Sequence, residues 1–298
     1  MTPRVPRPLL AVLSFGLAAI CLAAFPTVGS GAQGTGGPSS IVGPGIVWSA
    51  GMETGNLAEW TESWDSGLCF RPPNGVSTDV AYSGRYSMAM TIDTSQGDAG
   101  CRQARTQESR SGRPYHYGAW LYVPAYTRAT NYWNVVQFKS KRAGAAGSDP
   151  FWVVDLMPSS SGALALRLRW KGTVAGPFAG DGTAPRRWSD APVDVPVGRW
   201  FHLEVYVSQS GGFQGRVAVR QDGVELWDLV GVRTKYEDGD QRWTVNNYSD
   251  ALTPSPATLY VDDATIAINR VYPTGPRRGP SARSADAVSR ERTQPRAP

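Results

Sequence analysis

Three cations alternate with apolar residues near the middle of the chain. Arg167, Arg169 and Lys171 take odd positions of the segment 164–171, and the even positions from 164 to 170 are all apolar. Side chains of a strand point to opposite faces in turn, so one face would pack and the other would attract anions. The spacing predicts a strand that offers Arg167 and Arg169 to an anionic ligand.

The charge distribution supports a binding surface of this kind. Residues 102–171 contain eleven Lys or Arg against three Asp or Glu, whereas residues 33–101 carry a net charge of −5 and residues 172–273 one of −4. The formal charge of +5 for the whole chain hides this pattern because Arg residues gather at both ends. A basic segment between acidic ones suits a groove for a polyanion. Solvated charges that cluster only in sequence are the alternative.

The elements that would position these cations are strands. Short runs rich in β-branched and aromatic residues recur between turn-forming residues, and no segment has a helical period. Asp222-Gly223 predicts a tight hairpin turn. Residues 46–270 are therefore expected to form one all-β domain, an antiparallel β-sandwich of the jelly-roll kind. Strands are expected over 87–92, 119–123, 134–139, 152–156, 164–171, 201–207, 216–220, 258–261 and 264–268.

The two ends of the chain differ from this domain. Residues 1–32 combine Arg4 and Arg7 with an uncharged, mostly apolar run and small residues before position 33, which predicts a cleaved export signal. An uncleaved anchor is the alternative, because an apolar run of roughly 17 residues is near the lower limit for a membrane span. Residues 33–45 are expected to be a flexible linker and residues 271–298, rich in Arg and Pro, a disordered tail.

Export gives the cysteine count a meaning. After removal of the signal only Cys69 and Cys101 remain, and an even pair in an oxidising compartment favours a disulfide over two free thiols. The mature protein is expected to be secreted, extracellular and monomeric, with no membrane or nucleic-acid partner.

The tryptophans fall into two groups. Four lie in or beside apolar strand patterns and are expected in the core: Trp120, Trp170, Trp200 and Trp227. Three are flanked by polar residues, which suits stacking on a sugar ring as well as burial: Trp133, Trp188 and Trp243.

Three local patterns carry a family resemblance. Arg105-Thr106-Gln107, Gln137-Phe138-Lys139 and the segment 242–248 ending in Tyr248 resemble, in the same order, three strands of jelly-roll polysaccharide lyases. The segments 53–60 and 260–263 resemble the wider concanavalin A-like lectin and glucanase group. Together the resemblance covers about residues 47–269.

The resemblance implies an elimination reaction on an acidic polysaccharide. Such a lyase neutralises a uronate carboxylate, accepts the proton at C5 and returns one to the leaving oxygen at C4. Arg105 and Lys139, helped by Gln137, would hold the carboxylate and stabilise the enolate. Tyr248 would act as base and then as acid, since neighbouring cations favour a phenolate. Gln107, Arg167, Arg169, Trp133 and Trp243 would bind substrate, and the chemistry would need no cofactor.

Departures from the family pattern keep other functions open. Gln107 replaces a carboxylate, and Lys139 stands where a His is usual. If that His is essential, the chain is a non-catalytic carbohydrate-binding module or a structural envelope protein. If Tyr248 suffices with nearby cations, the chain is an active lyase. The sequence has no metal-spaced His pair and no nucleophile elbow.

The lectin-like resemblance also implies a structural cation. The ends of such sandwiches often meet at a Ca²⁺ site, and Ca²⁺ prefers hard oxygen ligands. Glu53, Asn56 and Asp262 are the ligands expected here, with ordinary turn and edge roles as the alternative.

Overall fold

The computed structural model describes residues 43–64, 68–170, 182–183 and 193–271. The expected export signal, nearly all of the linker and the expected tail lie outside these residues, as do Lys171 and Trp188. No helix among the described residues is long and apolar enough to span a membrane.

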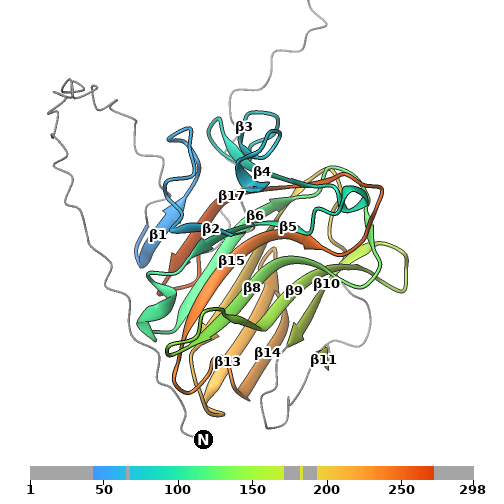
Figure 1. The fold of residues 1–298 in the computed structure, drawn as a ribbon. Coiled ribbons are helices and arrows are strands. Elements are labelled where there is room, and N and C mark those ends of the chain that lie inside the picture. Colours follow the sequence, from blue (N-terminus) through green and yellow to red (C-terminus); the bar gives the residue numbers. More distant parts are fainter. Residues whose placement is uncertain (1–42, 65–67, 171–181, 184–192, 272–298) are drawn as a thin grey trace, which may run out of the picture. The chain divides into compact units, whose positions relative to one another are not determined.

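Two antiparallel sheets make up the domain, and Figure 1 shows one sheet in front of the other. The eight-stranded sheet has the order β14 (Val224–Val232), β13 (Gly215–Gln221), β12 (Trp200–Ser208), β6 (Tyr115–Tyr122), β17 (Ala257–Ala267), β4 (Ser87–Ile92) and β3 (Gly75–Ser77), with β1 (Ile46–Ala50) beside β17. The seven-stranded sheet has the order β11 (Gly182–Thr183), β10 (Leu164–Trp170), β9 (Asp149–Pro158), β8 (Trp133–Arg142), β15 (Gly239–Ser249), β5 (Gly100–Arg105) and β2 (Glu62–Trp64).

Smaller elements complete the domain. A two-stranded sheet pairs β16 (Leu252–Thr253) with β7 (Arg128–Ala129), and three 3₁₀ turns are η1 (Leu68–Phe70), η2 (Thr94–Gln96) and η3 (Ser109–Ser111). The predicted antiparallel β-sandwich of jelly-roll type is thus confirmed.

The predicted hairpin turn is confirmed, and one strand prediction needs an adjustment. The hairpin turn between β13 and β14 has Asp222 at φ 49° and Gly223 at φ 84°, the positive values expected of a tight turn. The two strands expected over 258–268 are one strand, β17, which contains a register shift next to Asp263 at φ 44°. A bulge of this kind breaks the alternation on which the sequence prediction rests.

Aromatic side chains fill the space between the sheets. Tyr117 of β6 contacts Phe138 of β8 and Trp243 of β15, with ring centroids 4.9 and 5.3 Å apart. Trp133 is 0% and Trp243 1% exposed. The prediction that these two tryptophans stack on sugar was wrong, because their polar neighbours in sequence point to the opposite face of the sheet while the indoles themselves lie in the core.

One buried amide ties the sheets together beside a candidate site residue. Asn247 of β15 donates to the carbonyls of Met90 (2.7 Å) and Ala257 (2.9 Å) on the eight-stranded sheet, and accepts from Trp133 Nε1 at 2.7 Å. All of these groups are buried, so the bonds are protected from water. They fix the backbone of β15 next to Tyr248.

The predicted disulfide is present. Cys69 of η1 bonds to Cys101 of β5, with a Cα to Cα distance of 5.0 Å and a sequence separation of 32. It attaches the segment around η1 to the strand that carries Arg102.

Candidate active site

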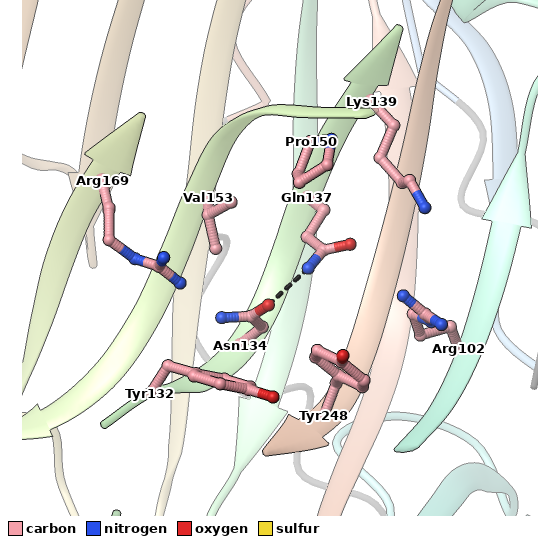
Figure 2. A pocket seen from close by; sticks show the side chains of 9 residues that line it. All are labelled: Arg102, Tyr132, Asn134, Gln137, Lys139, Pro150, Val153, Arg169 and Tyr248. Carbon is pink, nitrogen blue, oxygen red and sulfur yellow. Dashed lines mark hydrogen bonds between the residues drawn. The ribbon is translucent and has the colours of Figure 1, made fainter. Parts of the chain in front are cut away.

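A cavity of about 270 Å³ opens on the face of the seven-stranded sheet that points away from the core (Figure 2). Its walls come from neighbouring strands β5, β8, β9, β10 and β15, together with the residue before β8. The lining residues are Arg102, Tyr132, Asn134, Gln137, Lys139, Pro150, Val153, Arg169 and Tyr248.

A β-bulge gives the cavity one of its residues. Gln137 and Lys139 lie two apart on β8 and therefore share a face. Asn134 lies three residues before Gln137, yet the register of β8 against β9 shifts between Asn134 and Val136. The extra residue turns Asn134 onto the same face, where its side-chain carbonyl accepts a hydrogen bond from Gln137 Nε2.

Tyr248 is positioned by a glycine on the neighbouring strand. Gly100 is its cross-strand partner, and a Cβ at that position would lie 2.4 Å from Tyr248 Cδ2. Only glycine therefore allows the phenol ring to lie against β5 in this way. The guanidinium carbon of Arg102 is 4.5 Å from the ring centroid of Tyr248, which places a cation over the ring.

A second tyrosine stacks on Tyr248. The ring centroids of Tyr132 and Tyr248 are 5.4 Å apart at an interplanar angle of 26°. Burial, followed by the hydrogen bond to Tyr248, raises the pKa of the Tyr132 hydroxyl well above its usual value. Tyr132 therefore keeps its proton under physiological conditions.

A buried carboxylate organises the other wall of the cavity. Asp155 of β9 has a fully buried side chain and accepts from Arg167 Nη2 at 2.8 Å and from Arg169 Nε at 3.0 Å. Both arginines point to the side opposite their apolar neighbours, as predicted. However, they share one counter-ion, and Arg167 also donates to the Asn131 carbonyl at 2.9 Å. Only Arg169 reaches the cavity wall.

Asp155 also sets the direction of the amides. Because a carboxylate only accepts, Asn134 presents its Nδ2 to Asp155 and its Oδ1 to Gln137. Gln137 consequently gives its Nε2 to Asn134 and turns its Oε1 toward the side of the cavity where Lys139 and Arg102 end (Figure 2). This oxygen is buried and has no hydrogen-bond partner among the described residues. Gln137 was expected to donate to the carboxylate of the substrate. It presents an acceptor to the cavity instead, which suits a hydroxyl group.

Two further residues expected in the site, Arg105 and Gln107, also lie outside the cavity. Arg105 forms an ion pair with Glu108 at 2.6 Å, donates to the Glu59 carbonyl and lies 5.2 Å from the Trp48 ring. Arg105 lies an odd number of residues after Arg102 on β5, so the two side chains point to opposite faces of the strand. Gln107 follows the end of β5 and contacts Arg105. Neither position faces the cavity, and Arg102 takes the place expected of Arg105.

The residues expected to bind Ca²⁺ bind the backbone instead. Glu53 Oε1 accepts from the amides of Arg85 and Tyr86 at 2.9 and 2.8 Å, and Asp262 Oδ2 accepts from Tyr82 at 2.8 Å. Asn56 closes a local turn by accepting from the Ala58 amide at 2.9 Å. The described residues contain no group of three or more His, Cys, Asp or Glu side chains placed to hold a metal ion. Calcium is not supported, and the turn and edge roles account for these residues.

Asp262 is nevertheless an unusual carboxyl group. Burial and the neighbouring Asp263 raise its pKa to about 8, although three backbone amides that hydrogen-bond to it act in the opposite direction. Its contacts join the loop at Tyr82 and Ser83 to β17, which is a structural role.

Comparison with known proteins shows the family. A model of the polysaccharide lyase family matches residues 52–264. The chain belongs to the polysaccharide lyase family. No curated protein sequence matches this chain.

Solved structures share the fold of this chain. An endo-β-1,4-glucuronan lyase from the fungus Trichoderma reesei matches with a TM-score of 0.58 at 17% identity, over 75% of this chain and 96% of the other. A variant of the alginate lyase Aly36B in complex with an alginate trisaccharide matches with a TM-score of 0.50 at 13% identity, over 76% and 100% of the two chains. An alginate lyase from Aplysia kurodai matches with a TM-score of 0.47 at 12% identity, over 74% and 98%.

Four residues of the candidate site were not predicted from the sequence: Arg102, Tyr132, Asn134 and Asp155. Arg102 could have been predicted from the sequence, because it lies an even number of residues from Gly100, the cross-strand partner of Tyr248. Tyr132 precedes its strand, and Asn134 depends on a bulge that local sequence does not show. Asp155 belongs to a strand whose neighbours become known only with the sheet order.

Proposed function

We propose that the protein cleaves an acidic, uronate-containing polysaccharide by β-elimination, with Tyr248 transferring the proton. The observation that carries this proposal is that Tyr248, Lys139, Arg102 and Gln137 line a single cavity. A tyrosine beside two cations and an amide supplies the groups that elimination next to a carboxylate requires.

In the proposed reaction each group has one task. Lys139 and Arg102 neutralise the uronate carboxylate, which stabilises the negative charge that develops when the C5 proton leaves. The Tyr248 phenolate takes that proton. The C4–O4 bond then breaks, a double bond forms between C4 and C5, and Tyr248 returns the proton to the leaving oxygen. Gln137 Oε1 accepts from a sugar hydroxyl and so orients the ring.

The arrangement around Tyr248 fits this role. Tyr132 keeps its own proton and hydrogen-bonds to Tyr248, so a phenolate at Tyr248 has a donor beside it. Arg102 adds positive charge on the other side of the ring.

The choice of polymer and the location of the protein are part of the proposal. The Trichoderma reesei structure is described as a glucuronan lyase, which makes β-1,4-linked glucuronan the first polymer to test. The disulfide and the features of residues 1–32 favour secretion, where such polymers occur. We propose that the mature protein is a secreted monomer.

Activity is tested by incubating the mature protein with glucuronan, alginate, pectate and heparin and following the ultraviolet absorbance of the unsaturated uronyl product. Absorbance is expected to rise with at least one polymer, and Tyr248→Phe is expected to abolish it while binding persists, because only the hydroxyl is lost. If the wild type binds these polymers but yields no product, the protein is a binding module. If Tyr248→Phe retains full turnover, Tyr248 is not the base.

A further inference from the structure

A second cavity lies on the same two strands, beyond Lys139. Its volume is about 310 Å³, and it forms where the ends of β8 and β15 meet the turn η3. The residues that matter for its chemistry are Arg110, Lys141, Arg142, Arg242 and Asp240. None of them belongs to the Tyr248 cavity.

The two cavities share one face of the sheet. Lys139 pairs with Arg242 and Lys141 with Asp240, and the register of β8 against β15 is unbroken between these pairs. Gln137, Lys139 and Lys141 are therefore in line on one face. At about 3.4 Å per residue, Lys141 lies roughly 14 Å along β8 from Gln137. A ligand that reaches both cavities must be longer than one sugar.

The second cavity is positively charged. Four cationic side chains line it against the two carboxylates of Asp238 and Asp240. Asp240 is shared, because Arg110 approaches it at 2.8 Å and Arg242 at 3.3 Å. Arg142 is held by stacking, with its guanidinium carbon 3.9 Å from the Tyr236 ring centroid. Positive charge that exceeds its counter-ions inside a concavity attracts an anionic ligand.

We propose that this cavity is a second carboxylate-binding subsite, in which Lys141 holds a uronate unit of the chain whose cleavage point lies at Tyr248. The inference rests on the proposed function and narrows the range of polymers that would be substrates. A polymer that carries carboxylates on both units, a homopolyuronate, satisfies both cavities. A polymer in which the distant unit is neutral leaves the second cavity without its ligand.

The test measures the binding of β-1,4-glucuronic acid oligomers to the Tyr248→Phe protein, which holds them without cleavage. Calorimetry compares a hexasaccharide, which reaches both cavities, with a disaccharide, which fills one. Lys141→Ala is expected to weaken hexasaccharide binding about tenfold, the effect of losing one charge-assisted hydrogen bond, and to leave the disaccharide unchanged. Lys141→Arg should restore most of the affinity. Arg199→Ala, an exposed cation outside both cavities, is the matched control and should change neither ligand.

Two results would overturn the subsite while the proposed function stands: hexasaccharide binding that is unchanged in Lys141→Ala, or equal weakening of the hexasaccharide and the disaccharide. If no oligomer binds the Tyr248→Phe protein or the wild type, the proposed function fails and the subsite with it.

Discussion

Replacing Asp155 by Asn should destabilise the domain and also disorder the hydrogen-bonded side-chain amides of Asn134 and Gln137 in the cavity. The Asp155 side chain is 0% exposed, and those of Arg167 and Arg169 are 25% and 18% exposed. Breaking a buried ion pair by neutralising one partner costs about 3–5 kcal/mol. Because both arginines reach some water, the lower end of that range, about 3 kcal/mol, is expected for Asp155→Asn. This is a large part of the roughly 5–15 kcal/mol by which a domain is stable.

Urea denaturation measures the loss. With an m-value near 3 kcal/mol/M, a change of about 3 kcal/mol lowers the midpoint by about 1 M. Asp228→Asn is the matched control, since its partner Arg216 is 42% exposed and such pairs contribute less than about 1 kcal/mol. Asp155→Asn should also raise KM, because an amide at this position donates as well as accepts and so no longer fixes the direction of the Asn134 and Gln137 amides. Equal midpoints for the two variants would refute the reasoning.

Three further predictions follow from single contacts. Gly100→Ala places a methyl group 2.4 Å from Tyr248 Cδ2, so turnover should fall about a hundredfold while circular dichroism stays native; unchanged turnover would contradict this placement of the ring. Burial lowers the pKa of His202 from 6.5 to about 4, so the unfolded chain takes up a proton at higher pH than the folded chain, and about 3 kcal/mol of stability should be lost as the pH falls from 6.5 to 4. His202→Gln should flatten that part of the pH dependence of the unfolding free energy. An equally steep curve in the variant would exclude His202 as the source of the loss. Replacing both cysteines by Ala should lower the free energy of unfolding by about 3–4 kcal/mol for a loop of this length, whereas two reactive thiols in the denatured, unreduced protein would show that the disulfide does not form.

The fold was readable from sequence because alternation and turn chemistry are local signals. The strand over 87–92 coincides with β4, and the turn at Asp222 and Gly223 joins β13 to β14. Alternation failed at two bulges that each insert a residue, at Asn134 on β8 and at Asp263 on β17. At those points the sequence keeps its pattern while the side chains change faces.

Only part of the candidate site could be predicted from the sequence, because the residues that contact one another there lie far apart along the chain. Tyr248, Gln137 and Lys139 were found through motifs and do line one cavity. Arg105 was chosen from a motif whose position did not show which face of the strand it occupies. The basic character of Arg167 and Arg169 was visible, but the counter-ion Asp155 could be assigned to them only once β9 was known to lie beside β10.

The interleaving of site and core on the same strands limits how this protein can change over time. Gln137 lies between Val136 and Phe138, and Tyr248 between Asn247 and Ser249, all of them buried neighbours. A single inserted or deleted residue in β8 or β15, unless a bulge absorbs it, would exchange the two faces beyond that point and move core groups into the cavity and polar groups into the interior. Substitutions on the cavity face can therefore accumulate one at a time and alter which polymer is bound. Changes in strand length disrupt the core and the cavity together, so selection should remove them. Diversity among proteins built this way should appear as altered side chains on strands of constant length.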